Sequence, residues 1–301
     1  MKRLAHQSGQ SMVLTLLFMG VLLVMASAVI DVGAWYRADR QMQATADAAA
    51  LAGAQELPEF PGTAVSQALD YANNRNQGGV KAGDVEITGT KVANDTIKVT
   101  ARQPTPGVFS RLFGMNSVTV RSVAKARAGT LGSAKWAAPI GVDERHPELQ
   151  CEPLPCFGNA TTLELDKVGP GSFRIINIDG SQGGQASATL GVWIDKGLDA
   201  YMPLQWYWGD PGSSFNSSHV RDALDKRMGT ELLLPIFRNV RGGGSNFEYQ
   251  VVGWVGWHLT GHKISGKGTL EGWFTRVIWE GIESKTATDD DFGARAVSLI
   301  E

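Results

Sequence analysis

The sequence contains little cysteine, no excess of basic residues and only one long apolar run. Two of its 301 residues are cysteine, and 28 lysines and arginines against 30 aspartates and glutamates give a net charge of −2. This balance does not provide the basic surface that nucleic-acid binding needs, so we expect no nucleic-acid partner. One cysteine pair behind an apolar N-terminal run is typical of an exported protein.

Motifs for catalysis, cofactors and metals are also missing. The sequence has no P-loop, no dinucleotide-binding fingerprint and no G-x-S-x-G motif, so we expect neither enzymatic activity nor a cofactor. His258 and His262 are four residues apart, but they lie in a stretch typical of a strand and turn rather than of a metal-binding helix. Residues 179–183 begin like a D-x-S-x-S metal motif, but Gly183 offers no third ligand. We predict a tight turn there and no metal site.

Residues 11–30 form the apolar run and carry no charged side chain. A helix of this length extends about 30 Å, which matches the hydrocarbon core of a bilayer. Lys2 and Arg3 precede the run and predict a cytoplasmic N-terminus, with the rest of the chain outside the cytoplasmic membrane. A cleaved signal peptide is one alternative, because Ala26-Ser27-Ala28 resembles a cleavage site. A buried core helix is the other, although such a helix need not be apolar all round.

The helix is predicted to continue beyond the apolar run. Residues 31–57 contain no proline and many good helix formers, whereas Pro58 and Pro61 end the pattern. Small side chains let another helix approach closely, so we interpret Ala46, Ala49 and Ala50 as a helix-packing face. The alternative is that this stretch is simply a strong helix former.

The whole pattern predicts an α+β fold. It consists of a long N-terminal transmembrane helix, a small α+β module that is pilin-like by analogy, and a mostly antiparallel β domain, either a sandwich or a barrel. In the module we expect a helix over 63–76, a hairpin over 85–99, a helical turn over 108–113 and a strand over 118–126.

The β domain is predicted to contain one helix, over 218–228, and further strands over 232–237, 247–259, 269–279 and 294–300. The predicted domains are 1–57 for the lead, span and continuing helix, 58–128 for the module, 129–142 for a linker, and 143–301 for a tryptophan-rich β domain.

Cys151 and Cys156 are predicted to form a disulfide within one tight loop, because two prolines lie between them and the chain is exported. A zinc site would need two more ligands, and His146 is the only nearby candidate.

Seven of the nine tryptophans lie in the β domain, and Trp206 and Trp208 would share one face of a strand. They are interpreted either as part of an aromatic core or as a contact surface for a glycan or a partner protein.

The N-terminal motifs resemble those of the TadE/TadG-like family, which are envelope proteins of the tight-adherence (Tad, or Flp) pilus system. The resemblance covers about the first 57 residues and rests on four motifs in fixed order around the span: Gly9-Gln10, Asp31-Val32-Gly33, Tyr36-Arg37 and the alanine-rich stretch 46–54. It implies a non-enzymatic role in pilus assembly or anchoring, with the membrane and other pilin-like or Tad assembly proteins as partners.

One departure separates the chain from pilins that are processed and polymerised. Those proteins carry a glycine at the cleavage point and a glutamate five residues later, but here the position five after Gly9 is Leu14. The span contains no glutamate at all, so we expect a retained anchor similar to that of TadG-related proteins. A cell-wall-binding module that uses exposed tryptophans is the alternative function.

Overall fold

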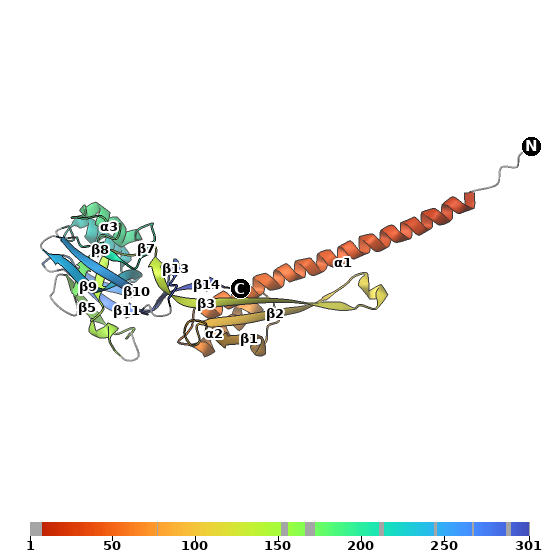
Figure 1. The fold of residues 1–301 in the computed structure, drawn as a ribbon, viewed down its shortest axis with the longest axis horizontal. Coiled ribbons are helices and arrows are strands. Elements are labelled where there is room, and N and C mark those ends of the chain that lie inside the picture. Colours follow the sequence, from red (N-terminus) through yellow and green to blue (C-terminus); the bar gives the residue numbers. More distant parts are fainter. Residues whose placement is uncertain are drawn as a thin grey trace, which may run out of the picture. The chain divides into compact units, whose positions relative to one another are not determined.

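The computed structural model describes residues 8–76, 78–151, 156–165, 172–210, 214–243, 246–266, 268–286 and 290–300. The chain divides into two compact units (Figure 1). Unit 1 comprises Met1–Arg127 and Ser298–Glu301, and unit 2 comprises Ala128–Val297. The helix and the α+β module that the sequence separates at residue 57 therefore lie in one unit.

Unit 1 begins with the long helix α1 (Ser8–Ala54), which confirms that the apolar run and the alanine-rich segment form one helix. Pro61 starts the next helix, α2 (Pro61–Asp70), and a π-helical turn, η1 (Tyr71–Arg75), extends it. The predicted helix over 63–76 is thus present. Figure 1 shows the first part of α1 extending beyond the rest of its unit.

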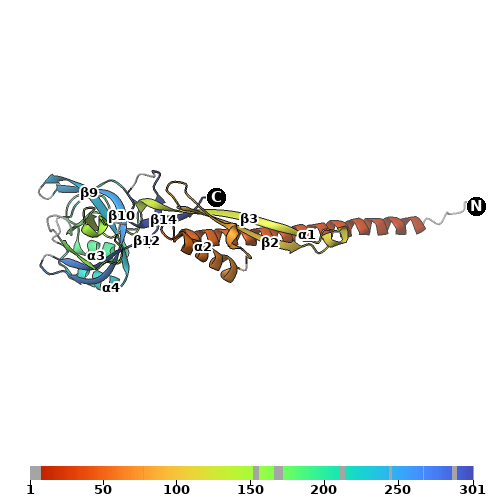
Figure 2. The same ribbon diagram turned by 90° about the horizontal axis from the view of Figure 1, so that it is seen from below.

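The strands of unit 1 form an antiparallel sheet in the order β1 (Val85–Thr88), β2 (Thr96–Pro106) and β3 (Ser117–Ala134). A short 3₁₀ turn, η2 (Ala82–Asp84), precedes β1. In the β1–β2 turn the carboxylate of Asp95 accepts hydrogen bonds from the backbone N–H groups of Thr90, Lys91 and Val92. Strands β2 and β3 pair from Thr96 opposite Arg127 to Pro106 opposite Ser117, and the two strands run beside α1 (Figure 2).

Strand β3 continues from unit 1 into unit 2, so the stretch expected as a linker over 129–142 is largely strand. Residues up to Ala134 belong to β3, and β4 (Ile140–Asp143) follows after a short break. The end of β3 pairs with β7 (Met202–Pro203) and with β13 (Gly281–Glu283). The small residues of this stretch are typical of a linker. In the fold, however, Gly132 is required because a Cβ there would lie 2.9 Å from the backbone of Ser284.

The centre of unit 2 is a closed ring of strands, so the barrel alternative is correct. The order is β11 (Thr269–Thr275), β5 (Thr161–Leu165), β6 (Ser172–Ile175), β4, β9 (Glu231–Gly243) and β10 (Asn246–Lys263), and β10 also pairs with β11. Most pairs are antiparallel, but β4–β9 and β5–β6 are parallel. Strand β8 (Trp206–Trp208) adds to β10, and β12 (Val277–Ile278) pairs in parallel with β14 (Ala294–Leu299).

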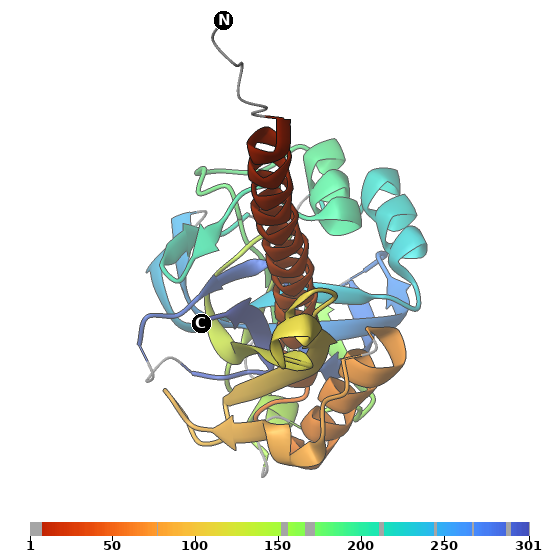
Figure 3. The ribbon, with the colours of Figure 1, turned by 90° about the vertical axis from the view of Figure 1, so that its right-hand side faces the viewer.

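Two helices pack side by side on unit 2, α3 (Ser187–Lys196) and α4 (Ser218–Arg227) (Figure 3). Helix α4 was predicted, and Ser217 caps it by accepting a hydrogen bond from the N–H of Val220. Helix α3 was not predicted, because Gly191 and the β-branched residues around it are poor helix formers. Gly191 serves tertiary packing, since a Cβ there would lie 2.8 Å from the carbonyl oxygen of His219 in α4.

Candidate functional site

The first part of α1 exposes its apolar side chains. Leu17 and Phe18 are 64% and 65% exposed, and the other large apolar side chains of residues 12–30 are exposed as well. Helix α1 is long and apolar enough to cross a membrane by length and composition, with a mean hydropathy of 2.7 over its most apolar window. A helix that is apolar all round and leaves its large apolar side chains exposed is typical of a membrane span.

The span ends at a junction with the β2–β3 hairpin. The connection between the two strands, residues 107–116, is called here the hairpin tip, and it contains a short 3₁₀ turn, η3 (Ser110–Phe113). The carboxylate of Asp31 accepts hydrogen bonds from the backbone N–H groups of Val108 (2.7 Å), Phe109 (3.1 Å) and Ser110 (2.7 Å). Asp31 is only 3% exposed. This single carboxylate therefore satisfies three backbone donors of the tip and fixes the tip to α1.

Two small residues make the junction close. A Cβ on Gly107 would lie 3.0 Å from a carboxylate oxygen of Asp31 and would overlap the hydroxyl of Ser110, so a larger residue would have to displace these side chains. Ser27, one turn before Asp31, is 6% exposed and donates its hydroxyl to the carbonyl of Val24, 2.7 Å away. The junction was not predicted from the sequence. Its only local signal is an aspartate directly after an apolar run, and its partners are 77 to 79 residues away.

Ala46, Ala49 and Ala50 are fully buried inside unit 1. They lie in the part of α1 whose neighbours are α2, η1 and β2. Gly53 belongs to the same surface, because a Cβ there would lie 2.5 Å from Cδ1 of Ile97 in β2 and 2.8 Å from the carbonyl oxygen of Ala64 in α2. The alanine face thus packs against this chain's own helix and sheet.

The tryptophans of unit 2 divide into two groups. Trp193, Trp254 and Trp257 are buried, and Trp257 packs edge-on against Phe274 with ring centroids 4.9 Å apart. Five others are partly exposed: Trp136, Trp206, Trp208, Trp273 and Trp279. The core interpretation thus fits the first group.

Trp206 and Trp208 lie on one face of β8, and Tyr207 between them points into the core. Burial raises the pKa of Tyr207 to about 12, and its hydroxyl donates to the carbonyl of Pro203, so it is a neutral structural group. The guanidinium of Arg241 lies 4.3 Å from the ring centroid of Trp206 and is itself paired with Glu248 at 2.6 Å. One face of the Trp206 ring is therefore covered by a cation.

A polar cleft of about 370 Å³ adjoins Trp206. Arg238 in this cleft is ion-paired with Glu144 at 2.7 Å and with Asp290, and these carboxylates hold its pKa above the ordinary value. The amide of Asn239 donates to the side chain of Gln250, another residue of the cleft wall, at 2.7 Å. An aromatic ring beside amide and charged groups has the chemistry that carbohydrate binding uses.

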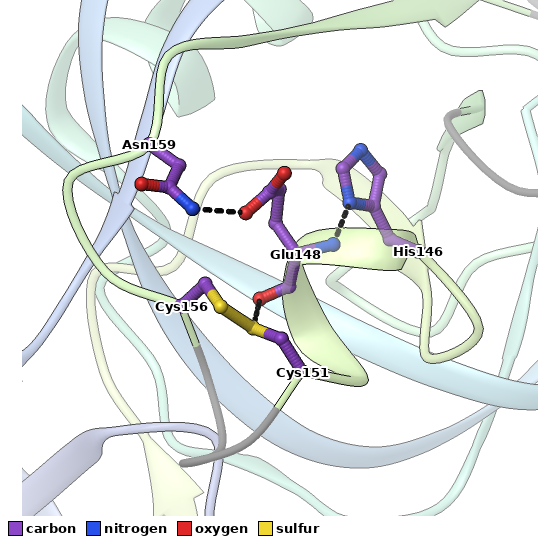
Figure 4. Close-up of a disulfide and its surroundings, with 5 residues drawn as sticks. All are labelled: His146, Glu148, Cys151, Cys156 and Asn159. Atoms are coloured by element: carbon purple, nitrogen blue, oxygen red, sulfur yellow. Dashed lines mark hydrogen bonds between the residues drawn. A yellow bond between two sulfur atoms is a disulfide. The ribbon is translucent and has the colours of Figure 1, made fainter.

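The sulfur atoms of Cys151 and Cys156 form a disulfide, with the Cα atoms 5.8 Å apart (Figure 4). Residues 152–155 between them lie outside the described part of the chain. The Sγ of Cys151 lies 3.5 Å from the carbonyl oxygen of Glu148, whose carboxylate accepts from the amide of Asn159. Glu148 and the two sulfurs are close enough to hold a metal, but sulfurs joined to each other are not thiolate ligands.

His146, the nearby histidine, is buried beside the disulfide loop. Its Nδ1 accepts a hydrogen bond from the N–H of Glu148 at 3.1 Å, and its ring packs edge-on against Phe274 with centroids 5.0 Å apart. Burial holds the pKa of His146 below its ordinary value, so the ring is neutral and caps the 3₁₀ turn η4 (Pro147–Leu149). Its environment is that of a structural residue.

The remaining candidates have separate partners. His258 contacts Glu231 at 3.0 Å and stacks on Trp273, whereas His262 contacts Asp225 at 2.8 Å. Asp179 accepts hydrogen bonds from the N–H and the hydroxyl of Ser181, as expected for a tight turn.

Comparison with known proteins identifies the N-terminal segment. Residues 9–56 match the family model described as putative Flp pilus-assembly TadE/G-like. The match includes the span, the Asp31 junction residue and the alanine face, and it confirms the resemblance inferred from the motifs. No curated protein and no solved structure matches the chain.

Proposed function

We propose that this chain is a non-enzymatic, membrane-anchored component of a Tad/Flp-type pilus that acts in pilus assembly or anchoring. The family match of residues 9–56 carries the proposal, because that segment contains both the exposed apolar part of α1 and the part that packs into unit 1. A single helix can thus join a membrane to a folded body without a hinge between them.

In this proposal the N-terminus is cytoplasmic and both units lie outside the cytoplasmic membrane. The basic residues Lys2 and Arg3 before the span favour this orientation. A disulfide in unit 2 agrees with it, since disulfides persist in oxidising compartments. The anchor is retained, because the span lacks the glutamate that accompanies pilin processing.

Contacts with other pilin-like helices would involve residues 11–30. Ala46, Ala49 and Ala50 are covered by α2, η1 and β2, whereas the apolar side chains of residues 12–30 are exposed. Within a membrane such a surface meets either lipid or another helix.

The test is complementation in the native host. Deleting the gene should abolish surface filaments, and the intact chain should restore them. Leu17→Arg with Leu22→Arg should fail to restore filaments, because each arginine costs about 2.5 to 3.5 kcal/mol near the centre of a span. The matched control, Val92→Arg in the exposed β1–β2 turn, should restore them. Normal filaments in the deletion strain would refute the proposal, and restoration by the double arginine variant would refute anchoring by this helix.

The second candidate is a glycan- or cell-wall-binding module in unit 2. The observation that favours it is the polar cleft beside the partly exposed Trp206 on β8. Sedimentation of the detergent-solubilised full chain with purified peptidoglycan tests it. Binding that is lost with Trp206→Ala and Trp208→Ala, and kept with Trp273→Ala on β11, would support this function. No binding by the intact chain would reject it.

A further inference from the structure

The hairpin tip places apolar side chains beside the membrane span. Val108 is 63% exposed and Met115 is 53% exposed, although both belong to a short connection between two strands. Such connections are normally polar because they face water. Residues 107–116 also contain Phe109, Leu112 and Phe113, together with Arg111, and no acidic residue.

The position of the tip along α1 follows from its contacts. Phe109, Ser110 and Met115 line a cleft of about 250 Å³ against α1, and the α1 residues in that cleft run from Val24 to Trp35. With a rise of about 1.5 Å per residue, Val24 lies roughly 10 Å before Asp31 along the helix axis. The tip therefore lies across the outer end of the span, beside its last two turns and the first turn of α1 that follows it.

The Asp31 junction keeps the tip at this level. Three backbone N–H groups bind one buried carboxylate, so the tip cannot slide along the helix without leaving those groups or the carboxylate unsatisfied. The junction also covers the two polar residues at the end of the span, Ser27 and Asp31. Ser27 and Asp31 are thus enclosed, while the apolar side chains of Val108 and Met115 stay exposed.

We propose that the hairpin tip inserts into the outer interface of the lipid bilayer and is a second membrane contact beside the span. The inference rests on the proposed membrane anchoring, because residues 11–30 fix the level of the bilayer. If they lie in the hydrocarbon core, Val108 and Met115 lie at its outer boundary. Arg111, which is exposed, lies where lipid phosphates are found, and long basic side chains extend toward such groups.

Depth-dependent fluorescence quenching tests the proposal on the full chain in lipid vesicles. An environment-sensitive dye is attached to Met115→Cys or Val108→Cys, and the native cysteines do not react because they form a disulfide. Leu17→Cys is the reference inside the span. Val92→Cys is the matched control, because Val92 is also apolar and 47% exposed, but lies beyond the opposite end of β2. Strand β2 has 11 residues, which corresponds to about 35 Å from the tip.

The emission of the dyes at Met115 and Val108 should shift to the blue. Lipids that carry a quencher near the headgroup should reduce the emission of these two dyes. The dye at Leu17 should be quenched best by lipids that carry the quencher deep in the acyl chain. The dye at Val92 should be quenched by neither kind of lipid. Asp31→Ala should weaken quenching at Met115 and leave quenching at Leu17 unchanged, because only the tip is released.

Three results would overturn the inference. If the dye at Leu17 is quenched while those at Met115 and Val108 behave like the dye at Val92, the tip is in water and only the anchor remains. If the dye at Leu17 is not quenched either, the proposed anchoring fails and the tip inference fails with it. A dye at Met115 that is shielded from water but not quenched by lipid would show that protein, rather than lipid, covers the tip.

Discussion

The packing of α1 into unit 1 can be measured at Gly53. In an exposed helix interior, replacing glycine by alanine stabilises a protein by about 0.5 to 1 kcal/mol, because alanine loses less backbone entropy on folding. At Gly53 the new Cβ would lie 2.8 Å from the backbone oxygen of Ala64 and 2.5 Å from Cδ1 of Ile97. The Ile97 methyl can rotate away, but the backbone oxygen belongs to α2 and cannot move alone.

Overpacking of this kind costs about 1 to 3 kcal/mol. After subtracting the gain in helix preference, Gly53→Ala should destabilise unit 1 by about 1 kcal/mol. Gly62→Ala is the matched control, since Gly62 lies in α2 and a Cβ there has nothing within 4 Å. It should not destabilise α2, because the new methyl group meets nothing and alanine favours the helix.

Hydrogen exchange followed by mass spectrometry measures both variants on the full chain. Peptides from α2 and β2 report the opening of unit 1 alone, because exchange of buried amides reflects the local free energy of opening. These peptides should exchange faster in Gly53→Ala and slower or equally fast in Gly62→Ala. Equal protection of both variants would refute the close packing of α1 on α2 and β2.

Two further predictions concern unit 2 and use the fluorescence of its tryptophans during urea unfolding. Burial lowers the pKa of His146, so as the pH falls below about 6.5 this histidine binds a proton in the unfolded chain before it does so in the folded one. The free energy of unfolding should therefore decrease in this pH range by up to about 1.4 kcal/mol per pH unit. His146→Asn, which keeps an acceptor for the N–H of Glu148, should show a flatter profile, whereas an unchanged profile would mean that other groups cause it. Replacing both cysteines by serine opens a loop with a sequence separation of 5 and should lower the free energy of unfolding of unit 2 by about 2 kcal/mol. Coincident unfolding curves for the two proteins would contradict a stabilising disulfide.

The structure changes how bulky replacements of Ala46, Ala49 or Ala50 are interpreted. The sequence shows a face of small side chains and does not say what covers it. The structure covers it with α2, η1 and β2 of the same chain, so these substitutions are expected to act through the stability of unit 1. A loss of pilus function in such variants would not by itself identify a contact with a partner helix.

Local features could be predicted from the sequence because their causes are local. An uncharged run of residues 11–30 forms an exposed apolar helix, and Ser217 starts α4 because its hydroxyl reaches an N–H three residues later. Hairpin β1–β2 follows from alternating side chains around a turn that Asp95 stabilises. The family motifs are of the same kind, since they lie within the 48 residues from 9 to 56.

Contacts between segments that are far apart in the sequence are determined only by the tertiary structure. Six strands form a closed ring because β10 pairs with β11. Helix α3 contains Gly191 because the backbone of α4 approaches closely at that position. The tertiary structure also brings Asp31 to the N–H groups of Val108 and Ser110, which lie 77 and 79 residues away in the sequence. Such contacts depend on strand register and on close approach of backbones, and neither leaves a periodic pattern in the residues involved. The sequence therefore determines the span, whereas the position of a second apolar segment beside it is a property of the fold.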